Sequence, residues 1–342
     1  MTPRKVTIID IAKRLNISKS TVSRALSNHH SIGLRTKMRV TQLASELNYE
    51  PDNRAIFFKQ RKTYLIGLIL PSLSNTFFAS IVSGVEDVAY QKKYTLLLGQ
   101  SRDDQEREKS IVETMKNHRV DGMLVSISKS TTSYEHFKLL EKNNIPVVFI
   151  DRIPEMKNIH FIACKLENGM IEAVSFLVKQ GHKIIGLING PENFSASKER
   201  YSAYLKALRK NKIKPDKKLI TCSDLTIDGN VAASKKLLAL ARRPTAIITF
   251  NDYVALDAID YCKRQKIRID KDISFVSFAN EAICNYMDHP PIASVEQFPY
   301  QQGQKATEML IEIIEKAKPE NENKKTFNNL LLQSQLVIRG TH

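Results

Sequence analysis

The chain has 342 residues and a mass of 38.9 kDa, with 42% hydrophobic and 26% charged residues. This is ordinary globular composition at a length of two or three domains, and it excludes a fibrous or intrinsically disordered protein. The unusual value is the charge, because 52 Lys and Arg against 36 Asp and Glu give a net of +16 and a pI near 9.6. Such an excess favours a polyanionic partner, either nucleic acid or an anionic membrane surface.

The apolar runs and the cysteine spacing exclude further classes. The longest apolar runs, Leu65–Leu70 and Val147–Ile150, have the length of strands, whereas a bilayer span needs roughly 20 residues. The N-terminus shows no apolar signal segment followed by a cleavage site. The four cysteines contain no Cys-x-x-Cys pair, so neither a zinc site nor a disulfide framework is indicated. We therefore expect a soluble, cytoplasmic protein without a metal or cofactor.

Positive charge is concentrated at the N-terminus. Residues 1–62 hold 13 Lys and Arg and four acidic residues, a net of +9, while the other 280 residues carry +7. More than half of the excess charge therefore lies in under a fifth of the chain. The sequence predicts a small basic module joined to a larger, less charged body.

The basic module contains three short helical patterns. Thr7 can cap a first helix over Ile8–Leu15, and Ser18 can cap a second over Lys19–Leu26. A third helix is expected over residues 35–48. Its inward-facing side chains are predicted to be Met38, Val40, Leu43, Ala44 and Leu47. Two short helices joined by a tight turn and braced by a third form a helix-turn-helix.

The second of these helices is the predicted reading element. Its first residues would enter the major groove of DNA, so Lys19, Ser20 and Arg24 would face base edges. Arginine can bind guanine there through two hydrogen bonds. The hydroxyl side chains suited to phosphate oxygens are Ser18, Thr21 and Ser23. On charge and periodicity alone, a module for RNA or a membrane surface and a solvated helical bundle remain alternatives.

From Tyr64 onward, apolar β-rich runs alternate with amphipathic helical segments. Strands are predicted at 64–70, 94–99, 122–127, 146–150, 183–188, 246–250 and 273–278. Helices are predicted at 78–91, 105–117, 168–180, 198–210, 229–240 and 253–265. This alternation indicates βαβ units with parallel sheets covered on both faces. Because about eleven strands are many for one open sheet, we expect two α/β lobes. Ligands would bind between them, at the carboxyl ends of the strands.

The residues also carry a family resemblance. Residues 7–26, TIIDIAKRLNISKSTVSRAL, resemble the N-terminus of the LacI/GalR (lactose-repressor-like) family of bacterial transcriptional regulators. The likeness continues in order at residues 47–51, 66–71, 74–78, 119–122, 145–148, 150–152, 181–183, 251–252 and 290–291. It therefore covers essentially the whole chain.

The resemblance implies an α/β protein with a small all-α N-terminal domain. A helix-turn-helix DNA-binding domain at 1–48 and a hinge at 49–62 would precede a two-lobed periplasmic-binding-protein-like core at 63–342. The first lobe would comprise about 63–162 and 293–325, and the second about 163–292 and 326–342. The implied function is a sequence-specific repressor that binds a pseudo-palindromic operator as a homodimer. A small metabolite, sugar-like and bound in the interlobe cleft, would control its DNA affinity.

In the family, the hinge places an apolar side chain in the central base step of the minor groove. The likeness puts Phe58 at that position, and phenylalanine is among the side chains that intercalate. Packing of Phe57 or Phe58 on the core lobe is the alternative. Residues 53–56 depart from the usual hinge, which leaves the central-step preference open. The full set predicted to contact DNA is Thr7, Ser18, Lys19, Ser20, Thr21, Ser23, Arg24, Ser31, Tyr49 and Phe58.

The effector site is likewise implied by the resemblance. Its residues would be Phe77, Asp151, Arg200, Asn251, Asn280 and Gln297. Arg200 stands where the family has an arginine that clamps effector hydroxyls or carboxylates. The alternative is that buried Asp and Arg side chains pair with each other and cap helices. Cys164-Lys165 and Ala279 stand where relatives often carry carboxylates, so an anionic or less hydroxylated ligand, or no effector at all, is a further alternative.

Two competing classes find less support. An enzyme is not predicted, because the chain has no GxSxG, GxGxxG, Walker or HExxH motif. The glycine-containing turn at 186–197 is only a weak candidate for holding a phosphate. A solute-binding protein would share the core fold, but it would need a signal peptide and would have no use for residues 1–62. A homodimer is expected because two half-sites of a palindrome require a two-fold pair of helix-turn-helix domains.

Overall fold

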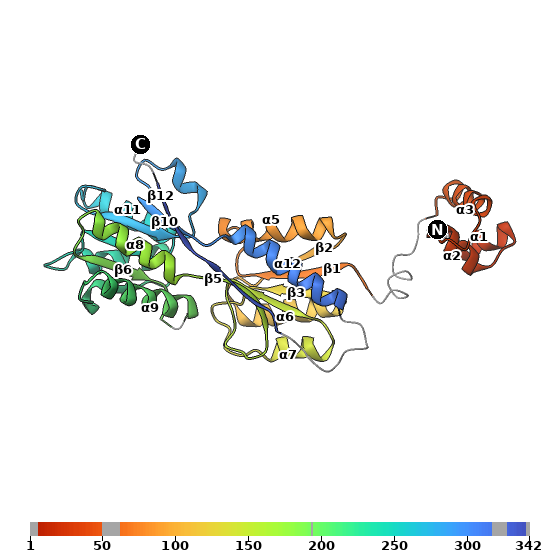
Figure 1. Cartoon of the computed structure of the whole chain (residues 1–342), viewed down its shortest axis with the longest axis horizontal. Helices are drawn as coiled ribbons and strands as arrows, with labels where there is room; N and C mark the ends of the chain where they lie inside the picture. Colours follow the sequence, from red (N-terminus) through yellow and green to blue (C-terminus); the bar gives the residue numbers. More distant parts are fainter. Residues whose placement is uncertain (1–5, 50–61, 193, 317–326, 340–342) are drawn as a thin grey trace. The chain divides into compact units, whose positions relative to one another are not determined.

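The computed structural model describes residues 6–49, 62–192, 194–316 and 327–339. The chain divides into two compact units, residues 1–63 and 64–342. Within its described residues, the first unit contains three helices, α1 (Ile8–Leu15), α2 (Lys19–Leu26) and α3 (Leu34–Glu46), labelled in Figure 1. The two predicted short helices and the tight turn between them are confirmed.

Capping side chains mark the starts of α1 and α2, and a left-handed residue marks the end of α1. The Asp10 carboxylate accepts from the Thr7 backbone N–H at 2.9 Å and from the Thr7 hydroxyl at 2.7 Å. Asn16 has a left-handed conformation, with φ 51°, at the end of α1. The Ser18 hydroxyl accepts from the Thr21 N–H at 3.0 Å and caps α2.

The core of this unit corrects one expectation. Ile11, Val22 and Val40 are fully buried, one from each helix. Met38, which was expected to face inward, is 64% exposed. Residues two positions apart on a helix point in nearly opposite directions, so the burial of Val40 turns Met38 to the outside.

The second unit contains two six-stranded sheets. The first sheet has the spatial order β11 (Asn329–Gln333), β5 (His160–Lys165), β4 (Val147–Ile150), β3 (Gly122–Val125), β1 (Leu65–Leu70) and β2 (Thr95–Gln100). The second has the order β12 (Gln335–Ile338), β10 (Ala293–Glu296), β9 (Ser274–Phe278), β8 (Ala246–Thr249), β6 (Ile185–Asn189) and β7 (Ile220–Cys222). All neighbouring strands are parallel except β10 and β12.

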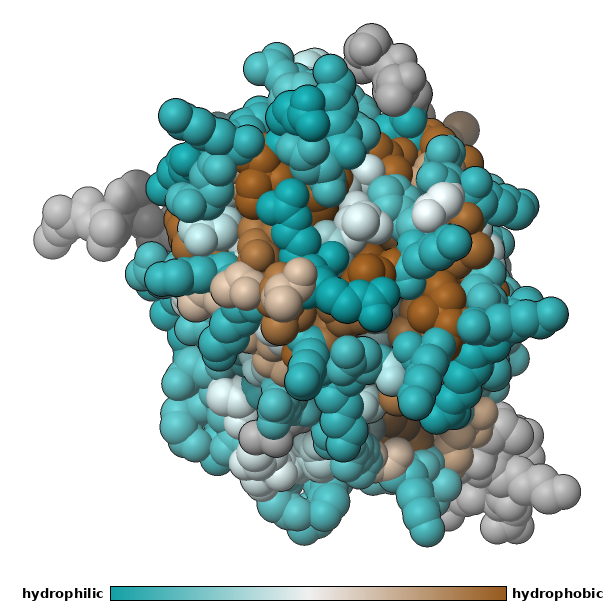
Figure 2. Space-filling view, turned by 90° about the vertical axis from the view of Figure 1, so that its left-hand side faces the viewer, coloured by the Kyte–Doolittle hydropathy of each residue, from teal (hydrophilic) through white to brown (hydrophobic). Residues whose placement is uncertain are grey.

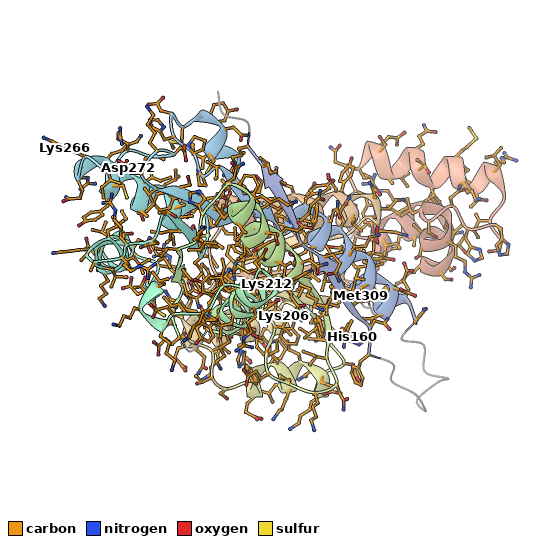
Figure 3. All side chains as sticks on the ribbon, turned by 60° about the vertical axis from the view of Figure 1, so that its left-hand side comes forward. His160, Lys206, Lys212, Lys266, Asp272 and Met309 are labelled. Carbon is orange, nitrogen blue, oxygen red and sulfur yellow. The ribbon has the colours of Figure 1, made fainter. Side chains whose placement is uncertain are left out.

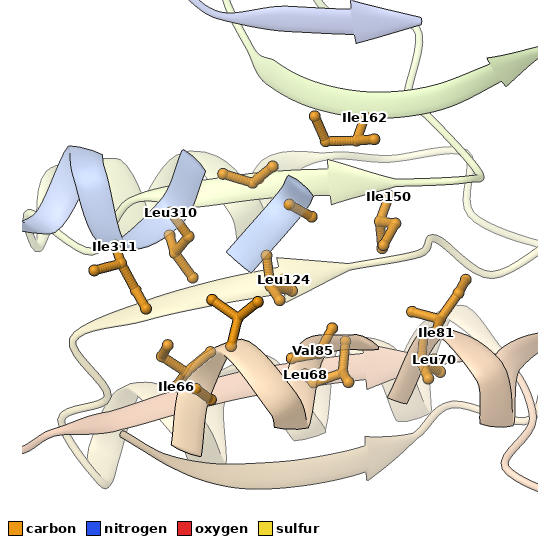
Figure 4. Packing of buried hydrophobic residues seen from close by; sticks show 14 of the residues in the cluster. Ile66, Leu68, Leu70, Ile81, Val85, Leu124, Ile150, Ile162, Leu310 and Ile311 are labelled. Carbon is orange, nitrogen blue, oxygen red and sulfur yellow. The ribbon is translucent and has the colours of Figure 1, made fainter. Parts of the chain in front are cut away.

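Helices cover both faces of each sheet, as the alternating pattern predicted. The first lobe carries α5 (Thr76–Gln91), α6 (Gln105–Asn117), α7 (Glu135–Lys142) and α12 (Pro299–Lys316). The second lobe carries α8 (Glu167–Lys179), α9 (Ser195–Lys210), α10 (Ile227–Leu238) and α11 (Asp252–Arg264), with short 3₁₀ turns at Lys217–Leu219 and Ala282–Tyr286. Figure 4 shows the core between α5, α12 and the first sheet, where Leu68, Leu124 and Leu310 interdigitate.

Helices α5 and α12 approach each other at two glycines. A Cβ added to Gly84 would lie 2.1 Å from the carbonyl oxygen of Tyr300, and one added to Gly303 would lie 2.4 Å from that of Ile81. Both contacts are with backbone, which has little freedom to move away. The crossing of these two helices therefore depends on glycine on each side.

The chain passes between the lobes at three points, and two of these differ from the expected positions. Strand β10, expected in the first lobe, belongs to the second sheet, where Ala293 and Val295 are buried in the second-lobe core. Strand β11, expected in the second lobe, pairs with β5 in the first sheet. The crossings therefore follow Glu296 and precede Gln335. A short apolar run beside a crossing carries no sequence signal for which sheet it joins, so tertiary pairing decides.

Candidate functional sites

The first candidate site is the start of α2. Lys19, Ser20 and Arg24 are all exposed, and Ser20 and Arg24, four residues apart, share one face of the helix. The Ser18 hydroxyl lies 2.7 Å from that of Ser20 and 2.8 Å from that of Thr21, so three hydroxyls gather in the first turn. The first turn presents backbone N–H groups, hydroxyls and Lys19, and Arg24 follows one turn later on the face of Ser20, a set suited to phosphates and base edges.

The other predicted DNA-contacting residues lie at helix ends and in loops of the same unit. Thr7 begins α1 and is exposed, and Ser23 lies half-buried in α2. The Ser31 N–H donates to His29 Nδ1 at 3.2 Å, and the two side chains also hydrogen-bond at 2.9 Å. Tyr49 is half-buried against the helical core, and its N–H donates to the Ala44 carbonyl at 2.8 Å. Phe58 lies outside the described residues.

The second candidate site is centred on Arg200 in α9, which is only 5% exposed. Its guanidinium donates to the Gln297 side chain at 3.0 Å and to the Ala196 carbonyl at 3.3 Å. It also stacks over Phe250 and Phe278, at 4.1 and 4.8 Å from their ring centroids. Burial lowers the pKa of this guanidinium to about 10.

One nitrogen of the Arg200 guanidinium has no partner in the described part of the chain. Among the described residues its Nε has no hydrogen-bond partner, although the atom is buried. A buried unsatisfied donor costs roughly 1–3 kcal/mol and calls for an explanation such as a bound acceptor. Arg200 is thus arranged to donate to an acceptor in addition to Gln297.

Asp151 and Arg152 follow β4 and face the same region. Burial raises the pKa of Asp151 to about 6, and this effect outweighs the opposite influence of Arg152 and Arg200. Arg152 forms an ion pair with Asp103, and its guanidinium lies 4.9 Å from the ring centroid of Phe194, at the start of α9 in the second lobe. Side chains of both lobes therefore meet around these two residues.

The remaining predicted cleft residues have structural partners of their own. The Asn251 side chain caps α11 by accepting from the Val254 N–H at 3.0 Å. Asn280 donates to Glu296 at 2.9 Å and accepts from Arg339 at 3.1 Å. Phe77 is buried in the first-lobe core, edge-on to Phe78. The structure thus joins Arg200 with Gln297 and places Asp151 near them. Asn251 instead caps a helix, Asn280 belongs to a hydrogen-bond network, and Phe77 is a core residue.

An interlobe contact that the sequence did not predict involves Glu281. This side chain follows β9, is 5% exposed, and its carboxylate accepts from the hydroxyl of Thr76, the first residue of α5. Its N–H donates to Asp252 at 2.7 Å. Burial, and then the charge of Asp252, raise the pKa of Glu281 to about 7. The sequence did offer a signal: position 279, where relatives often carry an acid, is Ala279, and an acid, Glu281, follows two positions later.

Asp252 anchors the network beneath Glu281. It is fully buried at the start of α11 and pairs with Arg339 at 3.2 Å. The Ser277 hydroxyl also donates to it, so strand β9, helix α11 and the residue that follows β12 are tied to one carboxylate. Cys284, buried nearby, and the other three cysteines are free.

Two negative findings concern only the part of the chain that the structure describes. No group of three or more His, Cys, Asp or Glu side chains is arranged to hold a metal ion. No helix there combines the length and the apolar character that a membrane crossing requires.

Comparison with known proteins identifies the family. The model described as "Bacterial regulatory proteins, lacI family" matches residues 7–52, and "Periplasmic binding proteins and sugar binding domain of LacI family" matches residues 63–339. The chain belongs to the LacI family. The HTH-type transcriptional repressor PurR of Vibrio atlanticus is 31% identical over 98% of both chains. The HTH-type transcriptional repressor CytR of Escherichia coli is 29% identical over 98% of this chain and 96% of that one.

A solved LacI-family structure gives the same result for the fold. The lac repressor dimer bound to operator and the anti-inducer ONPF matches with a TM-score of 0.83 at 25% identity, over 99% of each chain. The resemblance and the fold class inferred from the sequence are therefore confirmed. For this LacI-family chain, function as a DNA-binding transcriptional regulator follows from the family. The individual DNA-contacting and effector-contacting residues remain predictions.

Proposed function

We propose that this LacI-family chain is a cytoplasmic transcriptional repressor that binds a pseudo-palindromic operator as a homodimer. Lys19, Ser20 and Arg24 read bases in the major groove. The hydroxyls at the ends of α1 and α2, together with Ser31 and Tyr49, contact the phosphate backbone. Phe58 enters the central step of the minor groove. A small molecule held between the two lobes controls the affinity for DNA.

The observation that carries the ligand part is the unsatisfied Nε of Arg200. The guanidinium is held by two phenylalanine rings and by Gln297, so its Nε–H is preorganised for an acceptor. With Asp151 half-buried nearby, the site offers both donors and an acceptor, which suits a hydroxylated molecule such as a sugar or sugar derivative. Arg152 and Arg200 on the two sides of the cleft favour a derivative that also bears an anionic group.

The dimer is supported by the likeness to the lac repressor dimer and by exposed apolar side chains. Tyr286 is 84% exposed, and Ile283 and Met287 beside it are exposed as well. Apolar groups gathered in this way are typical of an interface. Tyr286→Glu is expected to lower the molecular mass measured by light scattering from that of a dimer toward that of a monomer, whereas an unchanged dimer would place the interface elsewhere.

The test of the DNA part is an operator selection from random duplex DNA at near-physiological salt. The wild-type chain is expected to enrich a two-fold palindrome. Arg24→Ala is expected to lose this enrichment, because the lost base contact costs about 1–3 kcal/mol of binding free energy per half-site. Arg39→Ala is the matched control, because Arg39 is exposed on α3 and lies outside the reading helix. Salt-sensitive binding without any enriched sequence, unchanged in Arg24→Ala, would contradict the proposal.

The ligand part is tested by thermal shift with a panel of neutral sugars, sugar phosphates and sugar acids. Selective stabilisation of the wild type, lost in Arg200→Ala, is the expected result. If neutral sugars alone stabilise the protein, the preference for an anionic derivative is wrong. If no compound in any class acts through Arg200, the effector site itself is wrong.

A further inference from the structure

The end of the second lobe that lies away from the cleft has a distinctive charge. Strands β7, β6, β8 and β9 are neighbouring and parallel, so their amino ends lie along one edge of the sheet. Four connections lead into them from the preceding helix ends, at residues 179–184, 209–219, 239–245 and 263–273. We call these four connections the basic end. Figure 2 looks onto the left-hand side of Figure 1, where α8, α9 and α11 lie, and shows long hydrophilic side chains projecting around small apolar areas.

The basic end carries 15 Lys and Arg and only three acidic residues, a net of +12. All 15 cationic side chains are exposed: Lys179, Lys183, Arg209, Lys210, Lys212, Lys214, Lys217, Lys218, Arg242, Arg243, Lys263, Arg264, Lys266, Arg268 and Lys271. Because residues 63–342 as a whole carry +7, the rest of the core is net negative. The positive charge of the core is therefore localised at this one end. In Figure 3, Lys266 projects from the edge of this lobe.

Three of the four connections are hydrogen-bonded to one another, and the fourth, 209–219, is tied to α8, because the Asn211 amide donates to the Ser175 hydroxyl at 3.1 Å. The side chains of His182 and Thr245 hydrogen-bond at 3.0 Å, and the Thr245 N–H donates to the Ile184 carbonyl at 2.9 Å. The Ser274 N–H donates to the Thr245 carbonyl at 3.0 Å. The cations are therefore presented on a rigid edge, and the cost of ordering loops on binding is small.

Helix dipoles explain only part of this charge. Cations are favoured in the last turn of a helix, but the effect fades beyond that turn. Ten of the 15 cations lie beyond the helix ends. The corresponding connections of the first lobe, at 92–94, 118–121 and 143–146, hold three cations beyond the helix ends: Lys92, Lys93 and Arg119. The second lobe thus has an excess that its helices do not require.

We propose that the basic end is a second DNA-binding surface, which holds the backbone of a duplex other than the operator. The four connections contain no Phe, Tyr or Trp, so they offer no platform for stacking the bases of a single strand. None of the exposed large apolar side chains lies in them, so they lack the anchors of a protein interface or a membrane-inserting surface. Cations without such groups suit the regular phosphates of double-stranded DNA.

The dimensions fit this partner. Adjacent strands are about 4.8 Å apart, so the edge from β7 to β9 spans roughly 14 Å before the flanking helices are added. Duplex DNA carries one charge per about 1.7 Å of its axis, so roughly eight phosphates lie within that length. A repressor already held at its operator would thereby bring a second DNA segment close.

The experiment measures capture of a labelled 30-base-pair duplex without operator sequence by full-length protein bound to an immobilised selected operator. The test variant is Lys212→Gln/Lys214→Gln/Lys218→Gln, three exposed side chains on one connection. The matched control is Lys92→Gln/Lys93→Gln/Lys142→Gln in the first lobe, which removes the same charge and, like the test variant, changes one left-handed lysine.

Wild type and control are expected to capture the second duplex with strong salt dependence. The test variant is expected to bind it at least about tenfold more weakly near 0.1 M salt, with a log–log salt slope lower by about 2–3. Affinity for the immobilised operator, measured on the same samples, reports separately on the helix-turn-helix. Absence of capture by wild type, or an equal loss in both variants, would overturn the proposal. Retention by phosphatidylglycerol vesicles without capture of duplex would overturn it as well.

Discussion

The two lobes of the core share one strand order and one pattern of helices, yet their polar side chains serve different purposes. In the first lobe the buried carboxylate is Glu108, which accepts from the Ser128 N–H, the Thr131 hydroxyl and His136 at 2.7–2.9 Å. In the second lobe Asp252 is fully buried and pairs with Arg339. The first network fastens loops of one lobe, whereas the second supports Glu281, which reaches the other lobe.

One scaffold can thus be specialised at the ends of its strands without a change in strand order. The first lobe supplies the start of α5 and the Asp151–Arg152 turn. The second lobe supplies Arg200, its aromatic bed and the exposed basic end. Sheets and helices support both lobes in the same way, so the functional asymmetry resides in the connections at the strand ends and in the first two turns of the helices.

The largest expected loss of stability comes from replacing the buried carboxylates. Asp252→Ala is expected to lower the free energy of unfolding by about 3–5 kcal/mol, because it leaves the Arg339 guanidinium, which is 8% exposed, without its counter-charge. Glu108→Gln keeps an acceptor for its neighbours and is expected to cost about 1–3 kcal/mol. Urea denaturation measures both. Equal losses would show that the two networks are equivalent and would break the comparison.

The next effect concerns the helix crossing of the first lobe. Gly84→Ala is expected to cost about 1–3 kcal/mol in unfolding free energy, since the new methyl group meets the Tyr300 carbonyl. Gly67→Ala is the control, because its nearest neighbour is the sulfur of Met115, at the flexible end of a side chain. Thermal unfolding of the two variants compares them directly. A similar loss at both positions would argue against a backbone-limited crossing.

The third effect concerns the affinity for the effector, which is proposed to depend on Arg200 of the second lobe. Arg200→Lys keeps the charge but loses the planar fork, so an effector found by thermal shift is expected to bind at least about tenfold more weakly. Lys198→Ala, an exposed position on the same helix, is the control and is expected to leave affinity unchanged. Titration calorimetry provides the measurement. Full affinity in Arg200→Lys would mean that the fork makes no contact with the effector.

The last effect is a pH dependence that joins the lobes and is small within any one pH unit. The pKa of Glu281 is about 7 in the folded protein and near 4.5 in a free chain, so between these values the folded state holds a proton that the unfolded state has lost. Stability contributed by this group is complete below pH 4.5 and falls as pH rises to 7, by at most about 1.4 kcal/mol per pH unit. Glu281→Gln is expected to remove this component, as seen in the difference between two pH–stability curves. Parallel curves would contradict it.

The local part of the structure could be predicted from the sequence. The caps Thr7 and Ser18 and the apolar spacing gave the limits of α1 and α2, because a helix end depends on side chains within three or four residues. The strand and helix alternation gave the fold class, because burial on both faces leaves a continuous apolar run in each strand. Arg200 and Asp151 could be singled out only through the family resemblance.

The rest depended on contacts between distant residues. The sheet that β10 and β11 join, the outward turn of Met38 and the meeting of Thr76 with Glu281 each depend on residues far along the chain. The roles of Asn251 and Asn280 could not be predicted from the sequence either. An asparagine at a strand end offers the same donor and acceptor groups whether it caps a helix or binds a ligand.

The basic N-terminal helices, the α/β character of the core and the family could all be predicted from the sequence, because they follow from local periodicity, capping and motif order. The tertiary structure decided which charges and carboxylates act together. The basic end combines four connections spread over residues 179–273, and they meet because parallel strands place every helix-to-strand connection of the lobe on one edge. The interlobe contact of Glu281 arises in the same way, because the carboxyl ends of the strands face the opposite lobe.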